Sequence, residues 1–250
     1  MASTSRFARC WRWWNELLGV FLNSPKQHDV LLYETMQTGQ PGTKTAPMLL
    51  NQHSMKNILF FGDSLTAGHG LPAAQSFPSL LQQRLDAQLL PYKAYNYGVS
   101  GETSAGGRQR LAAVLARHAV DVFVLALGAN DGIRGIPVRE TTQNLQFIID
   151  AVKRQHPAAQ IVLAGLEFPF DLGPLGGHRL AHYAAEFKAL FRTLADKNSL
   201  PFVPFLLQGV LGRRELNLPD GVHPNAPGQK ILAENVWQVL GPLLAQPVSS

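Results

Sequence analysis

Along most of this chain, short continuous apolar runs alternate with longer segments in which apolar residues recur at helical spacing. The run at residues 58–61 is short, uniformly apolar and bounded by turn residues, which indicates a buried strand. The segments predicted to be strands are residues 58–61, 92–97, 120–127, 161–166 and 201–207. The segments predicted to be helices are residues 76–90, 108–118, 141–155, 179–197 and 227–244.

The alternation of these elements predicts the fold class. Strands that are apolar throughout and alternate with helices indicate a parallel sheet covered by helices on both faces. We therefore expect a three-layer α/β domain in residues 55–250. Ser76 is expected to cap the first long helix, and the small-residue segment 99–107 is predicted to be a loop.

Residues 1–54 do not share this pattern and are expected to form a separate N-terminal extension. Three arginines precede a short apolar stretch at residues 17–22, an arrangement that resembles a poor signal peptide. We expect a poorly ordered extension with at most weak membrane-surface contact, or a start assigned too early, since Met55 directly precedes the first strand. On this basis we favour a cytoplasmic location, with a periplasmic or secreted one as the alternative.

Composition and charge narrow the function classes. Apolar residues make up 46% of the 250 residues and charged residues 16%, which favours a folded domain over a disordered chain. The net charge of +5 is scattered without a basic stripe, so we expect no nucleic-acid partner. One cysteine, Cys10, excludes an intramolecular disulfide and a cysteine-rich metal site. No apolar stretch of the sequence is long enough to span a bilayer, and we expect a monomer.

Four polar motifs stand out because packing gives no reason for them. Three follow the ends of predicted strands: Gly62-Asp63-Ser64, Ser100-Gly101-Glu102-Thr103 and Gly128-Ala129-Asn130-Asp131. Because the carboxyl ends of parallel strands meet at one edge of a sheet, we expect these three motifs to converge. The fourth, Asp220-Gly221-Val222-His223-Pro224, is predicted to be an extended loop or tight turn, because the prolines at 219 and 224 disfavour helix.

These residue types fit nucleophilic acyl transfer, which needs a hydroxyl, a base and donors for an oxyanion. Ser64 offers the hydroxyl, His223 the base, and Asp220 a partner that orients the ring and stabilises the imidazolium. By itself Ser64 would be interpreted as a helix N-cap, and it is the His223 motif that favours a nucleophile. The candidate oxyanion donors are the Ser64 N–H, the Gly101 N–H and the Asn130 side chain.

The four motifs resemble the sequence blocks of the SGNH (GDSL) hydrolase family, in the family order, over about residues 55–244. They are most similar to the subgroup of thioesterase I, lysophospholipase L1 and arylesterase. The resemblance implies a flavodoxin-like fold and catalysis by Ser64, Gly101, Asn130 and His223, with Asp220 as the third member of the triad. This chemistry requires no metal and no organic cofactor.

Two segments are candidates for contact with a substrate. Ile133 and Arg134 lie in a segment that is either a mobile flap over the substrate or a rigid turn. Phe168 and Phe170 begin a loop rich in proline and glycine, which is either an apolar acyl-binding wall or a packed crossover. His69 either lines the site or is a solvated loop residue.

The hypothesis that joins these observations is a serine esterase or thioesterase of lipid metabolism, acting on small acyl esters or lysolipids through an acyl-enzyme. A carbohydrate O-acetylesterase on the same scaffold is the alternative. A non-catalytic flavodoxin-like ligand-binding module is a more remote one, because it leaves Asp220 and His223 unexplained and the loop after the first strand carries no lysine for a phosphate.

Overall fold

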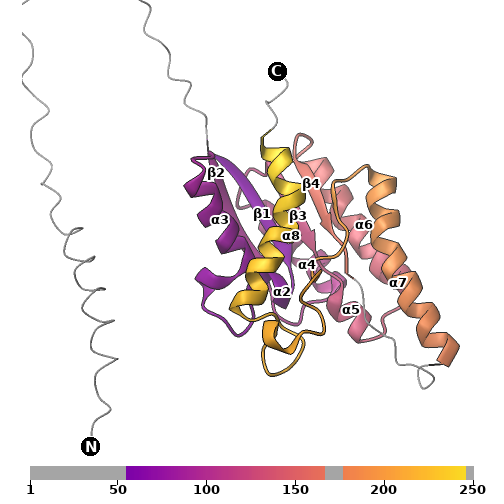
Figure 1. Ribbon diagram of the computed structural model, residues 1–250. Coiled ribbons are helices and arrows are strands. Elements are labelled where there is room, and N and C mark those ends of the chain that lie inside the picture. The colour runs from indigo at the N-terminus through magenta and orange to yellow at the C-terminus, as the bar shows by residue number, and fades with distance from the viewer. Residues whose placement is uncertain (1–54, 167–176, 246–250) are drawn as a thin grey trace, which may run out of the picture. The chain divides into compact units, whose positions relative to one another are not determined.

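The computed structural model of the chain describes residues 55–166 and 177–245. Five parallel strands form one sheet in the order β2-β1-β3-β4-β5 (Figure 1). The strands are β1 (Lys56–Gly62), β2 (Tyr92–Gly98), β3 (Val122–Ala126), β4 (Gln160–Ala164) and β5 (Phe202–Val203). This arrangement confirms the predicted α/β fold, and its strand order is that of flavodoxin-like proteins.

Helices cover both faces of the sheet (Figure 1). On one face, α3 (Phe77–Ala87) packs beside α8 (Ala226–Leu244). On the other face, α6 (Val138–Gln155) lies between α4 (Ser104–Leu115) and α7 (Gly177–Asn198). Four short elements lie in the connections: α2 (Ser64–Ala67), η1 (Ala73–Gln75), α5 (Ala129–Ile133) and η3 (Arg214–Leu216).

The two central strands are buried on both faces, which explains why the sequence shows continuous apolar runs there instead of alternation. Every residue of β1 from Ile58 to Phe61 is fully buried, and so are Phe123 and Leu125 of β3. The first strand is therefore fixed inside the core, and the residues that follow it are held at the edge of the sheet.

The predicted loop at residues 99–107 is wrong in its second half, because α4 begins at Ser104. The Thr103 hydroxyl caps the helix by accepting a hydrogen bond from the Gly106 N–H at 3.3 Å. A Cβ atom at Gly107 would lie 2.4 Å from Cδ1 of Leu127. The glycine therefore permits a close approach of the helix to the sheet and does not mark a loop.

The predicted strand at residues 201–207 is also wrong in its extent, because β5 contains only Phe202 and Val203. Pro204 has no N–H to donate to a ladder, and the chain turns after it. Leu206 is buried in this turn, and its N–H donates to the Gly165 carbonyl at 3.0 Å. The apolar pattern thus reports burial correctly but not strand pairing.

Ser76 occupies the N-cap position of α3, but its side chain does not cap the helix as expected. Its hydroxyl donates to the Ala73 carbonyl at 2.9 Å instead. The Phe77 N–H donates to Oε1 of the buried Gln229 of α8 at 2.8 Å, and Nε2 of Gln229 donates to the Leu65 carbonyl at 3.3 Å. The last helix is thereby tied to the segment that carries Ser64.

Within residues 55–166 and 177–245, no helix is both long and apolar enough to cross a bilayer. The N-terminal extension, residues 1–54, lies outside the described residues. Phe168 and Phe170 also lie outside them, so the acyl-binding role suggested for that loop stays a prediction.

Candidate active site

The strand register brings three of the polar motifs to one edge of the sheet. Gly62 at the end of β1 pairs with Gly98 of β2 on one side and Ala126 of β3 on the other. The chain leaves β1 for β2 on one side and then places β3 on the opposite side, and such a reversal is where open α/β sheets bind ligands. Ser64 follows β1 at this point, and Asn130 follows β3.

Gly62 cannot carry a side chain in this arrangement. A Cβ atom there would lie 2.1 Å from Oγ1 of Thr66 and 2.7 Å from the Ala126 carbonyl oxygen. The glycine therefore lets α2 pack closely against the end of β1. Ser64 is the first residue of that helix and not its cap. Asp63 is the N-cap, and its Oδ1 accepts a hydrogen bond from the Leu65 N–H at 3.0 Å.

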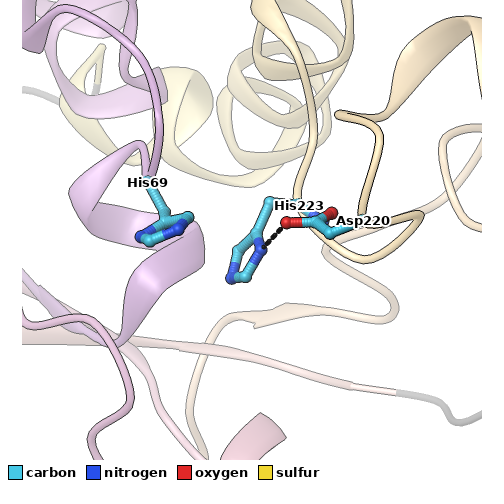
Figure 2. Close-up of side chains that lie close together, drawn as sticks. All are labelled: His69, Asp220 and His223. Atoms are coloured by element: carbon cyan, nitrogen blue, oxygen red, sulfur yellow. Dashed lines mark hydrogen bonds and ion pairs between the residues drawn. The ribbon is translucent and has the colours of Figure 1, made fainter.

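Ser64, His223 and Asp220 form one chain of hydrogen bonds. Nε2 of His223 lies 3.0 Å from Oγ of Ser64, and Nδ1 of His223 lies 2.7 Å from Oδ2 of Asp220. An ionised carboxylate only accepts hydrogen bonds, so Nδ1 of a neutral imidazole carries the proton and Nε2 is left to accept one from the hydroxyl. Figure 2 shows the His223 ring between the Asp220 carboxylate and His69.

The segment that carries Asp220 and His223 is a tight turn, as its prolines predicted. Its base is closed by a hydrogen bond from the Leu218 N–H to the His223 carbonyl at 2.7 Å, and Gly221 at its tip has a φ of 72°. The N–H groups of Val222 and His223 both donate to Oδ1 of Asp220, at 2.9 and 3.0 Å. Together with the ring of His223, these bonds lower the pKa of Asp220 to about 2, with the His223 N–H as the largest cause.

The candidate oxyanion donors Gly101 and Asn130 meet at Glu102. Gly101 has a φ of 78°, a left-handed conformation that favours glycine. The Glu102 carbonyl accepts a hydrogen bond from Nδ2 of Asn130 at 3.0 Å. This bond identifies the nitrogen end of the Asn130 amide, and among the described residues its second N–H has no protein acceptor.

A group that the sequence did not reveal lies behind these donors. Arg110, on the second half of α4, donates through Nε to both carboxylate oxygens of Glu102 at 2.7 and 2.8 Å. Its Nη2 donates to the carbonyls of Tyr97 at 2.8 Å and Gly62 at 3.2 Å, and to the same carboxylate. The guanidinium carbon lies 4.0 Å from the centroid of the Phe61 ring. No spacing rule links an arginine to a glutamate eight positions earlier, so only the tertiary structure shows this contact.

Asp131 fixes the loops around the site. It is fully buried and accepts hydrogen bonds from the Ser104 N–H at 2.8 Å and from the Thr141 hydroxyl at 3.2 Å. The Ser104 hydroxyl also donates to this carboxylate. Because Asp131 lies on α5, Ser104 on α4 and Thr141 on α6, these bonds hold α5, and with it Asn130, against the two longer helices.

Asp63 is fully buried beside Ser64, and its Oδ2 has no hydrogen-bond partner among the described residues. Burial raises the pKa of Asp63 to about 7, although the hydrogen bond from the Leu65 N–H opposes this. The charges of Asp131 and Glu102 act in the same direction as burial. This carboxyl group therefore caps α2 with a pKa far above its usual value.

His69 lies directly against the site. Its Nδ1 is 3.2 Å from the Ser100 hydroxyl, and its ring centroid is 4.3 Å from that of His223. Among the described residues, one group of three histidine, cysteine or acidic side chains lies close enough together to share a metal ion, and its members are His69, Asp220 and His223. Both ring nitrogens of His223 are already used by Asp220 and Ser64, so the arrangement fits a proton relay better than a set of metal ligands.

The structure places Ile133 and Arg134 at the end of α5, beyond Asn130. The Ile133 side chain is 58% exposed. Nη2 of Arg134 donates to the Gly101 carbonyl at 3.0 Å, so this segment contacts the loop after β2. A contact of Ile133 or Arg134 with a substrate stays a prediction.

Comparison with known proteins agrees with this geometry. The model of the GDSL-like lipase/acylhydrolase family matches residues 60–231, which include Ser64, Gly101, Asn130, Asp220 and His223. A crystal structure of TesA superposes with a TM-score of 0.69 at 36% identity and covers 75% of this chain and 99% of that chain.

Three relatives are similar over most of their length. Esterase TesA of Pseudomonas aeruginosa is 36% identical over 79% of this chain and 94% of its own length. The arylesterase of Vibrio mimicus is 33% identical over 74% of this chain and 88% of its own length. The thioesterase 1/protease 1/lysophospholipase L1 of Escherichia coli K12 is 31% identical over 75% of this chain and 84% of its own length.

Proposed function

Because the chain belongs to the GDSL-like lipase/acylhydrolase family, we propose that it hydrolyses acyl esters and thioesters with Ser64 as its nucleophile. The observation that carries this assignment is the hydrogen-bonded series from Ser64 through His223 to Asp220, with distances of 3.0 and 2.7 Å. In this proposal His223 is the general base, and Asp220 orients its ring and stabilises the imidazolium.

The reaction follows from these positions. Nε2 of His223 takes the hydroxyl proton while Oγ of Ser64 attacks the carbonyl carbon, which gives a tetrahedral oxyanion. The Ser64 N–H, the Gly101 N–H and the second side-chain N–H of Asn130 stabilise that charge. His223 then returns the proton to the leaving alcohol or thiol, and an acyl-enzyme remains. A water molecule deprotonated by His223 then attacks the acyl-enzyme, and His223 returns that proton to Oγ of Ser64 as the bond to the acyl group breaks and the acid leaves.

Two observations support an apolar acyl group. The segments that carry Gly101, Asn130 and His223 each expose a large apolar side chain: Val99 is 44% exposed, Ile133 58% and Val222 47%. Contact with an acyl chain would remove these apolar side chains from water, which is more favourable than contact with the polar surface of a sugar. The names of the relatives, which include arylesterase, thioesterase and lysophospholipase, support the same substrate class.

The test is hydrolysis of a series of p-nitrophenyl esters, from acetate to palmitate, by the wild type, Ser64→Ala and Ser79→Ala. Ser79 is a matched control, because it lies on α3 and hydrogen-bonds to Ser76 outside the site. We expect Ser64→Ala to lose hydrolysis at every chain length and to lose labelling by a fluorophosphonate, while Ser79→Ala keeps both.

The outcome at each chain length is informative. An optimum at medium or long acyl chains agrees with the exposed apolar side chains of Val99, Ile133 and Val222, whereas activity confined to acetate would favour the O-acetylesterase alternative. Hydrolysis that persists in Ser64→Ala would refute the proposed nucleophile. A wild type that neither hydrolyses any ester nor accepts the fluorophosphonate would favour the non-catalytic binding module.

A further inference from the structure

The two oxyanion donors outside α2 come from separate segments, the loop after β2 for Gly101 and helix α5 for Asn130, and Glu102 connects them. The Gly101 N–H lies in a turn closed by a hydrogen bond from the Glu102 N–H to the Val99 carbonyl at 3.2 Å. The Glu102 carbonyl then accepts the hydrogen bond from Nδ2 of Asn130 at 3.0 Å. A displacement of the Glu102 backbone would therefore move both donors together.

The Glu102 side chain is held more firmly than a surface ion pair. Its side chain is 8% exposed and that of Arg110 is 22% exposed. Nε of Arg110 donates to Oε1 of Glu102 and Nη2 donates to Oε2, which makes the pair bidentate. By comparison, the side chains of the Arg84–Glu234 pair between α3 and α8 are 37% and 53% exposed.

Arg110 is itself fixed by the ends of two strands. Its Nη2 donates to the carbonyl of Gly62 at the end of β1 and to that of Tyr97 near the end of β2. The guanidinium also lies over the ring of the fully buried Phe61. Gly62 is two residues before Ser64, so the Arg110 guanidinium joins the Ser64 segment to the loop that carries Gly101 and Glu102.

We propose that Arg110 and Glu102 are positioning residues that hold the Gly101 N–H and the Asn130 amide where the oxyanion develops. This inference rests on the proposed function, because it concerns the same site. Oxyanion donors stabilise the transition state only when they are fixed at the position of the developing charge. Loosening them should therefore lower kcat more than it changes the KM of the substrate.

The experiment compares Arg110→Lys, Arg110→Gln and Glu102→Gln with the control Arg84→Gln, using p-nitrophenyl butyrate and thermal unfolding. Removal of one oxyanion donor costs about 100- to 1,000-fold in kcat, so misplacement of two should cost about 10- to 100-fold in Arg110→Gln, with KM within about threefold. Arg110→Lys should recover part of this loss, because it keeps the charge but not the planar fork. Arg84→Gln should keep the wild-type kcat.

A kcat for folded Arg110→Gln within about twofold of the wild type, even with a lower melting temperature, would show a merely structural pair. If Arg110→Gln does not fold, Glu102→Gln decides by the same criterion, since the amide keeps the size of the side chain and some of its hydrogen bonds. Ser64→Ala separates the two hypotheses. Activity that survives in Ser64→Ala refutes the proposed function, whereas activity lost there but unchanged in Glu102→Gln and Arg110→Gln refutes only this inference.

Discussion

Replacement of Asp63 by Asn should change how the stability of the protein depends on pH. The carboxyl group is fully buried, and its pKa is raised from 3.8 to about 7, mainly by burial. A pKa difference of one corresponds to about 1.4 kcal/mol, so a difference of about three makes the ionised form roughly 4 kcal/mol less favourable in the folded chain than in the unfolded one.

The direction of the effect follows from proton binding. Between pH 4 and pH 7 the folded state holds a proton on Asp63 that the unfolded state has lost, so the free energy of unfolding falls as the pH rises. The contribution of the neutral Asp63 carboxyl group to the free energy of unfolding is fully present below pH 3.8 and is lost by about pH 7. The amide in Asp63→Asn cannot ionise, but its oxygen can still cap the Leu65 N–H. Any fixed cost of the amide is the same at every pH.

The measurement is urea unfolding of the wild type and Asp63→Asn from pH 4 to pH 8 at constant ionic strength. Relative to the variant, the wild type should lose roughly 3 to 4 kcal/mol across this range. Asp86→Asn is the control, because it removes an exposed carboxylate of α3 and keeps Asp63. Its free energy of unfolding should change with pH as that of the wild type does. A difference between wild type and Asp63→Asn that stays constant over the whole range would refute the reasoning, since Asp63 would then be ionised throughout.

Two further substitutions test the geometry of the site. Asp220→Asn should lower kcat by about 10,000-fold in the ester assay, because the amide cannot hold the His223 ring in the required tautomer, while thermal unfolding changes little at this exposed turn. A loss below about tenfold would contradict the assigned role. Gly62→Ala should destabilise the fold by at least about 1 to 3 kcal/mol, on the order expected for overpacking, because its Cβ would lie 2.1 Å from Oγ1 of Thr66. An unchanged melting temperature would show that α2 shifts freely.

The sequence predicts the fold well because its two strongest signals are local. Uniformly apolar runs such as residues 58–61 indicate strands buried on both faces, and those strands occupy the centre of the sheet. The turn from Asp220 to His223 is predictable for the same reason, since two prolines restrict the backbone there and Gly221 permits the positive φ at its tip. The prediction that Ser64, Asp220 and His223 converge agrees with the observed distances.

What the sequence does not predict depends on contacts between distant segments. Gly107 suggests a loop by local propensity, but it lies within α4. It is a glycine there because Leu127 leaves no room for a side chain. Arg110 looks like any polar residue of a helix, although its partners come from two strand ends and a loop. Ser76 has the right residue type for a cap, yet Gln229, 152 positions from Phe77, takes that role.

The three residues of the proposed triad are separated by very different distances along the polypeptide. Asp220 and His223 are neighbours in one turn, whereas the contact between Ser64 and His223 joins residues separated by 159 positions. Gln229 ties the following helix to the Ser64 segment and so closes this long span. During synthesis from the N-terminus, the ribosome completes β1 and Ser64 long before it adds His223. A prematurely terminated chain therefore carries Ser64 without the base proposed to activate it, and a nascent chain acquires the complete proposed triad only after most of the polypeptide has been made.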